Sequence, residues 1–194
     1  LDDNLYEKVS KTRAQALAFS FRQTKENVAA NVYNRAFNAA FLGGDGVSLC
    51  NVAHPNTSGG TWSNKLAIDA DLSELALEDL IVQIMGATND RGLLISLMPK
   101  SLHVPRQEWF NANRILKSVY QSGTANNDIN VLKATNAIPN GIKINHYFSA
   151  AHAWFLRTNV QNGMKYYSRK AIMFDQDNDF DTENARMKAT ERYT

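Results

Sequence analysis

The stretch of sequence that decides the fold is LDDNLYEKVSKTRAQALAFSFRQTKENVAANVYNRAFNAAFLGG, residues 1–44. Most of its apolar residues are three or four positions apart, which is the period of a helix with one apolar side. They are Leu5, Val9, Ala16, Leu17, Phe21, Val28, Val32, Ala36, Phe37 and Ala40. No glycine or proline interrupts residues 1–42, so the pattern predicts one long helix.

Local signals set the expected ends of this helix. Asp2 and Asp3 suit an N-terminal cap, and Gly43-Gly44 supplies a stop. We therefore predict a helix over residues 3–41, about 55 Å long at about 1.5 Å per residue. Two helices broken near residues 20–24, where Gln23 and Thr24 dilute the apolar stripe, are the alternative.

The middle of the chain mixes loops, strands and two further helices. Residues 43–64 are rich in turn residues around a short predicted strand at 47–52. A helix begins at Asp71 or Ser73 and ends near Gly86, and an apolar run at 92–98 predicts a buried strand that continues at 102–104. A third helix is predicted over 106–119, with Trp109, Ile115, Leu116 and Val119 inward.

The last third of the chain changes to strand-like patterns. Two Asn-Gly pairs, at 140–141 and 162–163, predict hairpin turns between strands at 142–144, 153–156 and 164–174. Residues 180–194 alternate weakly, which favours a long half-buried strand, with a helix as the alternative. The sequence thus predicts an α+β protein.

Composition excludes several classes of function. The 194 residues are 44% hydrophobic and 21% charged, with a net charge of +2, which is ordinary for a globular protein and unlike a dedicated nucleic-acid binder. A single cysteine excludes a disulfide framework and a cysteine-rich metal site. No apolar run reaches the roughly 18 residues of a membrane-spanning helix.

Charge is unevenly distributed along the chain. Residues 43–99 carry seven acidic and two basic side chains, whereas residues 100–170 carry ten basic and two acidic side chains. Such patches can meet between copies of the chain. Alternatively, they meet inside one fold, or each is a solvated face.

Two clusters could carry chemistry. Cys50 and His54 are four residues apart and could form a thiol–imidazole pair, although a turn and a buried cysteine explain them as well. The stretch DQDNDFD at 175–181 imitates the start of a calcium loop, but Phe180 replaces the required glycine and Arg186 the closing glutamate. We therefore predict no catalytic residue, no cofactor and no metal site, and we interpret residues 175–181 as a connecting turn.

Several short phrases in order along the chain resemble the major capsid (head) proteins of tailed bacteriophages, especially the Mu-like major head family. The phrases are YNRAF at 33–37, GDGVSLC at 44–50, AHP at 53–55, GGTWSN at 59–64, ADLSE at 70–74, DRG at 90–92, AWFL at 153–156 and DFDTEN at 179–184. No phrase is diagnostic alone, but their order across nearly the whole chain is fairly specific.

The resemblance implies a Hong Kong 97-like capsid fold. Residues 1–91 would be the first part of the peripheral domain, with its long spine helix at 3–41. Residues 92–165 would be the axial domain, and residues 166–194 would return as long strands of the peripheral domain. The family's N-terminal arm, its extended loop and a further strand after the Tyr193 region are not found in this sequence.

The implied function is structural: many copies assemble into an icosahedral head that encloses double-stranded DNA. The implied partners are the chain itself in hexamers and pentamers, scaffold or portal proteins, and non-specifically held DNA, without a membrane. The implied location of the protein is the virion capsid, which is assembled in the bacterial host cytoplasm. Arg106, Arg114 and Lys117 are candidate contacts with acidic surfaces of adjacent copies. Alternatives are an encapsulin-like nanocompartment shell and, remotely, a small cysteine-dependent enzyme using Cys50 and His54.

Overall fold

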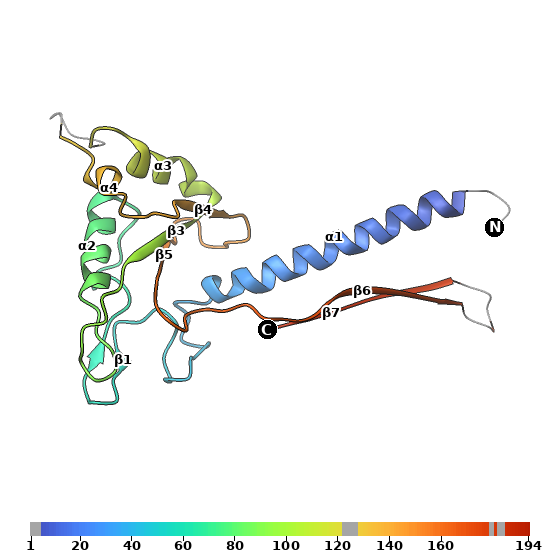
Figure 1. Cartoon of the computed structure of the whole chain (residues 1–194), viewed down its shortest axis with the longest axis horizontal. Helices are drawn as coiled ribbons and strands as arrows, with labels where there is room; N and C mark the ends of the chain where they lie inside the picture. The colour runs from blue at the N-terminus through green and yellow to red at the C-terminus, as the bar shows by residue number, and fades with distance from the viewer. Residues whose placement is uncertain (1–4, 122–127, 179–180, 182–184) are drawn as a thin grey trace. The chain divides into compact units, whose positions relative to one another are not determined.

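The chain folds as an α+β protein in two compact units (Figure 1). The computed structural model describes residues 5–121, 128–178, 181 and 185–194. One unit contains Leu1–Thr24 and Gln161–Thr194, and the other contains Lys25–Val160. Mixed helix and strand content was predicted from the sequence and is confirmed.

The first element, α1, is one continuous helix over Leu5–Asn34, with 30 residues. Its length is about 45 Å at about 1.5 Å per residue. The predicted alternative of a break near residues 20–24 is wrong, because α1 is regular helix through these residues. The hydroxyl of Thr24 donates to the carbonyl of Ser20 at 3.0 Å within it. The proposed capping residues at the N-terminal end lie outside the described residues.

The predicted C-terminal end of this helix, at residue 41, is wrong. The helix ends at Asn34, whose side chain donates to the Tyr147 carbonyl at 3.1 Å and accepts from the Ser149 amide at 3.0 Å. Two tight turns follow, and the carbonyl of Ala36 then accepts from the Cys50 amide at 2.8 Å. Contacts with distant segments therefore end the helix before the local stop signal at Gly43-Gly44.

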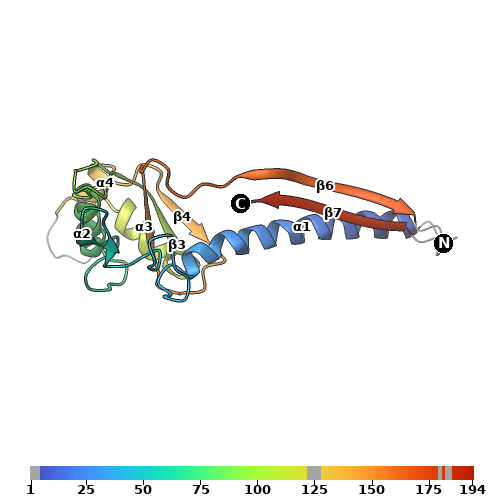
Figure 2. The same cartoon turned by 90° about the horizontal axis from the view of Figure 1, so that it is seen from below.

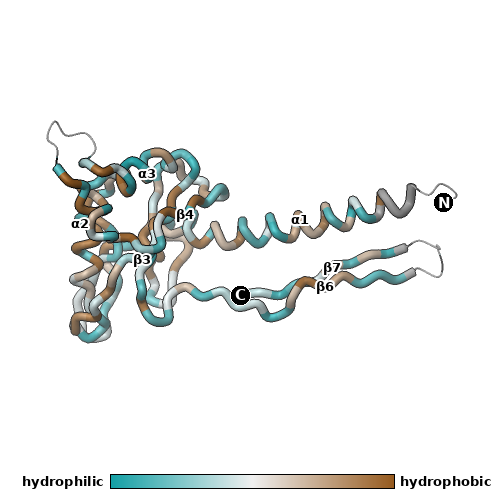
Figure 3. The backbone as a smooth tube through the Cα atoms, turned by 45° about the horizontal axis from the view of Figure 1, so that its top comes forward, coloured by the Kyte–Doolittle hydropathy of each residue, from teal (hydrophilic) through white to brown (hydrophobic). Residues whose placement is uncertain are grey.

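The apolar stripe of α1 is largely uncovered. Val9, Leu17, Val28 and Val32, which the sequence places on that stripe, are exposed, and so is Phe19. Apolar and polar segments alternate along this helix (Figure 3). These four positions of the stripe are therefore left uncovered by the residues of this chain that the structure describes.

A three-stranded sheet lies at the centre of the larger unit. Strand β3 (Pro99–Pro105) is its middle strand, pairing in parallel with β4 (Ile142–Asn145) and antiparallel with β5 (Phe155–Thr158). A 3₁₀ turn, η1 (Arg106–Glu108), and two helices, α3 (Trp109–Lys117) and α4 (Val131–Ala134), connect β3 to β4.

This topology overturns the hairpin expected at residues 140–141. Gly141 does adopt a positive φ of 64° in a turn, but the strand that follows pairs in parallel with β3 across the α3–α4 connection. An Asn-Gly pair fixes the local backbone, whereas the choice of partner strand is made by burial against distant residues.

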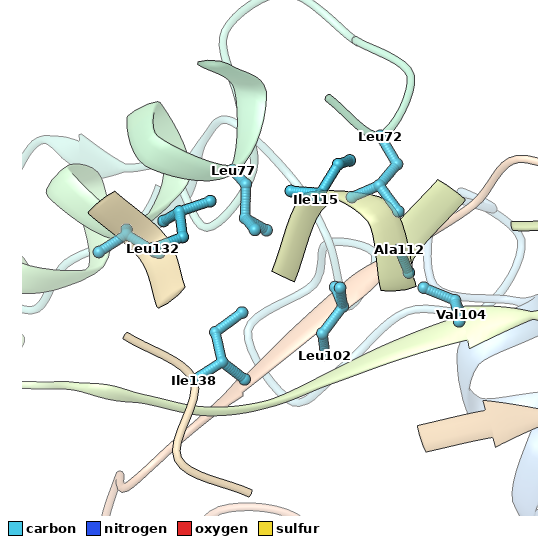
Figure 4. Packing of buried hydrophobic residues seen from close by; sticks show 9 residues of the cluster. Leu72, Leu77, Leu102, Val104, Ala112, Ile115, Leu132 and Ile138 are labelled. Carbon is cyan, nitrogen blue, oxygen red and sulfur yellow. The ribbon is translucent and has the colours of Figure 1, made fainter. Parts of the chain in front are cut away.

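The hydrophobic core lies between this sheet and the helices. Helix α2 (Glu74–Met85) contributes Leu77 and Ile81, β3 contributes Leu102 and Val104, and α3 contributes Ile115. Leu72, Ala112, Leu132 and Ile138 complete the buried cluster. Their side chains gather between α2, α3 and β3 (Figure 4). The two helices are therefore fixed on one common core.

The end of α1 is joined to the same sheet by an aromatic cluster. The ring of Tyr33 stacks on His103 of β3 with centroids 5.7 Å apart and meets Phe155 of β5 edge-on at 5.1 Å. Phe148 and Phe37 extend the cluster through Phe155. Burial lowers the pKa of His103 to about 4, with Arg157 and Lys143 acting in the same direction, so this ring is neutral at pH 7.

Local signals predicted the two ends of α2 correctly, but Leu75 and Met85, expected on its buried side, are exposed. Its N-cap is Ser73, whose side chain accepts from the Ala76 amide at 3.2 Å, and its C-cap is Gly86. The flanking loops were predicted less well: β1 (His54–Pro55) and β2 (Thr61–Trp62) form a small ladder, and the predicted strand at 47–52 is reduced to a single bridge with Leu42.

The buried strand predicted at residues 92–98 is wrong. This segment is irregular, Leu93 and Leu94 are exposed, and Ser96 has a positive φ of 48°. The strand begins only at Pro99. A short apolar run alone does not show whether its residues form a buried strand or an exposed irregular segment.

The C-terminal strands β6 (Ser168–Asn178) and β7 (Ala185–Tyr193) form an antiparallel pair (Figures 1 and 2). The strand predicted at 180–194, rather than a helix, is confirmed over β7. Asn162 has a positive φ of 59°, but the predicted hairpin does not form there, because the turn joins no paired strands. Residues 175–178, interpreted as part of a connecting turn, belong to β6.

Candidate assembly surface

The three predicted contact residues all lie at the surface around α3. Arg106 is in η1, and Arg114 and Lys117 are in the last turn of α3; each is exposed. The opposite side of α3 carries Ala112 and Ile115, which are buried in the core. The amphipathic pattern of this helix therefore directs the positive charge away from the protein interior.

An apolar residue completes this surface. Phe110 is 70% exposed and precedes Arg114 and Lys117 by four and seven residues, so the three share one side of the helix. We call Phe110, Arg114 and Lys117 the basic face. Sequence reasoning missed Phe110, although its helical spacing to the two basic residues was a usable signal.

The predicted inward side of this helix is correct only in part. Ile115 is buried and Leu116 and Trp109 are partly buried, whereas Val119 is exposed. The reason is that α3 ends at Lys117, with the backbone extended at Ser118.

The N-terminal end of α3 is held by a buried carboxylate. Glu108 is 8% exposed, and its carboxylate accepts from Asn111 Nδ2 at 2.9 Å and contacts His152 Nδ1 at 2.7 Å. The hydrogen bond to Glu108 raises the pKa of His152. Asn111 Nδ2 also donates to the carbonyl of Leu72 at 2.9 Å. Two segments distant in the sequence, around Leu72 and His152, thus fix the start of this helix.

The C-terminal end of α3 is held by Asn130. This side chain is 1% exposed and donates from Nδ2 to the carbonyl of Ile115 and to the hydroxyl of Ser118, the latter at 3.0 Å. It also caps α4, because its Oδ1 accepts from the Lys133 amide at 3.1 Å. The basic face is therefore presented by a helix anchored at both ends.

The smaller unit presents an amphipathic ribbon. In the regular part of the β6–β7 ladder, Phe174 pairs with Ala189 and Gln176 with Met187, so one side is mostly apolar. The other side carries Asp175, whose carboxylate is 3.7 Å from the ammonium group of Lys188. Phe174 and Met187 are both about half exposed.

The structure does not assemble a catalytic pair from Cys50 and His54. Burial raises the pKa of Cys50 to about 11, so its thiol is protonated at neutral pH and is a weak nucleophile. The Nδ1 atom of His54 contacts Asp45 Oδ2 at 2.6 Å, and its buried Nε2 has no hydrogen-bond partner among the described residues. The hydrogen bond from His54 lowers the pKa of Asp45.

The acidic stretch at 175–181, which imitates the start of a calcium loop, is divided between β6 and the segment after it. Asp175 and Asp177 lie on β6, Asp179 is outside the described residues, and Asp181 is exposed. Over the part of the chain that the structure describes, no group of three His, Cys, Asp or Glu residues is placed to hold a metal ion.

No helix in the described ranges has both the length and the apolar character that crossing a membrane requires. The longest helix, α1, is rich in polar and charged side chains.

Comparison with known proteins identifies the family. The model of the phage capsid protein family matches residues 2–194. The chain belongs to this family. No curated protein and no solved structure gives a significant match to it.

Phage capsid proteins are structural, and copies of them associate into a shell together with other phage proteins. The exposed apolar and charged surfaces of this phage capsid protein are therefore where contacts between subunits are to be sought. The stripe on α1, the basic face of α3 and the apolar side of the β6–β7 ribbon are candidate contacts with neighbouring subunits.

Proposed function

We propose that this capsid protein is a Mu-like major head subunit with a Hong Kong 97-like fold, and that it assembles in the host cytoplasm into an icosahedral shell around double-stranded DNA. The main support is that α1 is one continuous helix whose apolar stripe stays exposed. A single chain gains little from a helix whose Val9, Leu17, Val28 and Val32 stay exposed, whereas a shell subunit can bury these residues against neighbours.

Within this proposal α1 is the spine helix of the peripheral domain, which takes residues 1–91 and the long strands of residues 166–194. Residues 92–165, which include the β3–β4–β5 sheet and α3, form the axial domain that surrounds the symmetry axes of the shell. Its copies form hexamers and pentamers, and scaffold or portal proteins bind the assembled subunits.

The net charge of +2 is consistent with such a shell. A shell wall that only confines DNA needs few basic contacts with phosphate groups. Each such contact would strengthen the binding of DNA to the wall and hold the DNA there. Contacts between subunits can be individually weak, since many of them act together in a closed assembly.

The basic residues Arg106, Arg114 and Lys117 contact acidic surfaces of adjacent copies in this proposal. Their exposure supports the assignment, because exposed side chains can reach a neighbouring copy. Their replacement should also leave the core side of α3 undisturbed. Reversing the charge of all three residues is expected to impair assembly and to leave the far-UV circular dichroism spectrum unchanged. Unchanged sedimentation of the assembled protein would contradict this assignment.

The test of the whole proposal is the expression of the protein in a bacterium and examination of the purified product by sedimentation and negative-stain microscopy. Uniform hollow particles are the expected result. A product that remains monomeric at all concentrations would contradict it. Particles that enclose a cargo enzyme, instead of supporting DNA packaging with portal proteins, would favour the encapsulin-like alternative.

A further inference from the structure

Helix α2 carries a second unpartnered face, with the opposite charge. Leu75 and Val82 are each 69% exposed, and Asp79 lies between them on the same side of the helix. Ala76, Leu77 and Ile81 are buried and lie toward the core. We call Leu75, Asp79 and Val82 the acidic face.

The charge of this face is not neutralised by its surroundings. Helix α2 contains Glu74, Glu78 and Asp79 but no basic residue, and none is present in its last turn. Partial burial and the charge of Glu78 raise the pKa of Glu74. The ion pairs of Asp45, Asp69, Glu108 and Asp175 all lie outside α2.

The two faces have the same spacing and complementary chemistry. Positions 75, 79 and 82 are Leu, Asp and Val, and positions 110, 114 and 117 are Phe, Arg and Lys, so each face has a charged residue four positions after an exposed apolar one. We propose that the basic face on α3 of one copy packs antiparallel against the acidic face on α2 of the next copy. This inference rests on the proposed function, because it requires that copies associate.

The direction of packing follows from where charge lies along each helix. The carboxylates of α2 are in its first half, and Val82 and Met85 are in its second half; α3 begins with Phe110 and ends with its basic residues. Antiparallel packing therefore places the basic end of α3 opposite the acidic end of α2, and Phe110 opposite Val82. Parallel packing would instead place Lys117 beside Val82 and leave Glu74 and Glu78 opposite the apolar end.

The same arrangement gives Arg106 a role. It precedes Phe110 by about one helical turn, so antiparallel packing brings it toward Gly86, the C-cap of α2. The C-terminal end of a helix carries a partial negative charge, and a basic side chain is favourable there. All three residues singled out by the charge pattern thus meet the same partner helix.

The geometry of a shell agrees with two different, complementary faces. Each copy offers one of each, so the contact is heterologous and repeats around a ring. Leu77 of α2 and Ile115 of α3 belong to one buried cluster, so the angle between the faces is fixed within the subunit (Figure 4). Fixed faces are what a closed ring requires.

The first test exchanges the central charges in the intact protein. Asp79→Arg and Arg114→Asp are each expected to weaken association by roughly tenfold or more, measured by sedimentation, because like charges then face each other. The double variant restores an opposite pair at every contact and is expected to return to within about threefold of the wild type. Arg91→Asp, an exposed reversal outside both faces, is the matched control and should associate normally.

A second test fixes the direction of packing without relying on charge. In a Cys50→Ser background, oxidation of the Val82→Cys, Phe110→Cys variant should give a ladder of covalent oligomers. The Leu75→Cys, Phe110→Cys variant should not, because a disulfide requires Cα atoms within about 7 Å. The reverse result would overturn the antiparallel arrangement.

The outcomes separate this inference from the proposed function. Wild-type protein that forms shells while both single reversals also assemble, or while the double variant stays as weak as the singles, overturns only the helix pairing. Wild-type protein that never associates overturns the proposed function and the pairing together. Circular dichroism of each variant confirms that the subunit itself remains folded.

Discussion

Replacing Asn130 with alanine should strongly destabilise the larger unit, because this one side chain holds two helices. Its oxygen caps α4 through the Lys133 amide at 3.1 Å, and losing such a cap costs about 1 kcal/mol. Its amide group donates to the carbonyl of Ile115, near the C-terminal end of α3, and leaving a buried acceptor unpaired costs about 1–3 kcal/mol. The expected loss is therefore about 2–4 kcal/mol.

Urea unfolding followed by circular dichroism measures this loss. Asn130→Ser separates the two contributions, because serine caps a helix about as well as asparagine but lacks the amide donors. It should recover about 1 kcal/mol of the loss. Asn140→Ala, at an exposed asparagine, is the control and should change stability by less than about 0.5 kcal/mol.

This reasoning fails if Asn130→Ala costs no more than the Asn140→Ala control. It also fails if the serine variant is as unstable as the alanine variant, since the cap would then contribute nothing. The first result would mean that α3 is held by its other contacts, such as the packing of Ala112 and Ile115. The second would mean that the bond from the Asn130 amide group to Ile115 carries the whole effect.

Three further predictions concern the core, pH and the thiol. Leu77→Ala, at a fully buried position, should cost about 3–5 kcal/mol in urea unfolding, and a loss below about 1 kcal/mol would contradict the packing. The pKa of His152 is raised in the folded state by Glu108, so its stabilising effect is present below about pH 6.5 and lost as pH rises through the folded pKa. Wild type should therefore lose stability relative to His152→Gln across that range, and parallel profiles would refute the pairing. Burial raises the pKa of Cys50 to about 11, so alkylation at pH 8 should be at least about tenfold slower in native than in urea-unfolded protein; equal rates would show that the thiol is accessible.

Elements with complete local signals could be predicted from the sequence. Helix α2 has a capping serine at 73, a regular apolar pattern and a glycine at 86, and its ends are where those residues indicate. The weak alternation at residues 180–194 likewise predicted a strand, which is observed as β7. In both cases neighbouring residues carry enough information, because caps and side-chain period act over a few positions.

Elements whose limits depend on distant contacts could not be predicted in this way. Helix α1 ends at Asn34 because that side chain binds the backbone near residues 147–149, which nothing in residues 1–44 reveals. The apolar run at 92–98 was assigned to the interior, although Leu93 and Leu94 are exposed. Hydrophobicity alone does not separate residues buried within a subunit from apolar residues exposed at its surface.

The candidate assembly surface was predicted in part. The uneven distribution of charge pointed to Arg106, Arg114 and Lys117, and the structure places all three at the surface. Phe110 was not predicted, because an apolar residue in an amphipathic helix is ordinarily expected on the inward side. The matching face of α2 became recognisable only once exposure separated Leu75 and Val82 from the core residues beside them.

The β6–β7 ribbon has a consequence for how free and incorporated subunits differ. Two strands joined only to each other are marginally stable in water, and this pair keeps Phe174 and Met187 in contact with solvent. A surface that covers that apolar side would therefore add to its stability. The ribbon would then be less stable in an isolated subunit than in the shell. A protease would therefore cut the ribbon in free subunits and spare it in assembled ones.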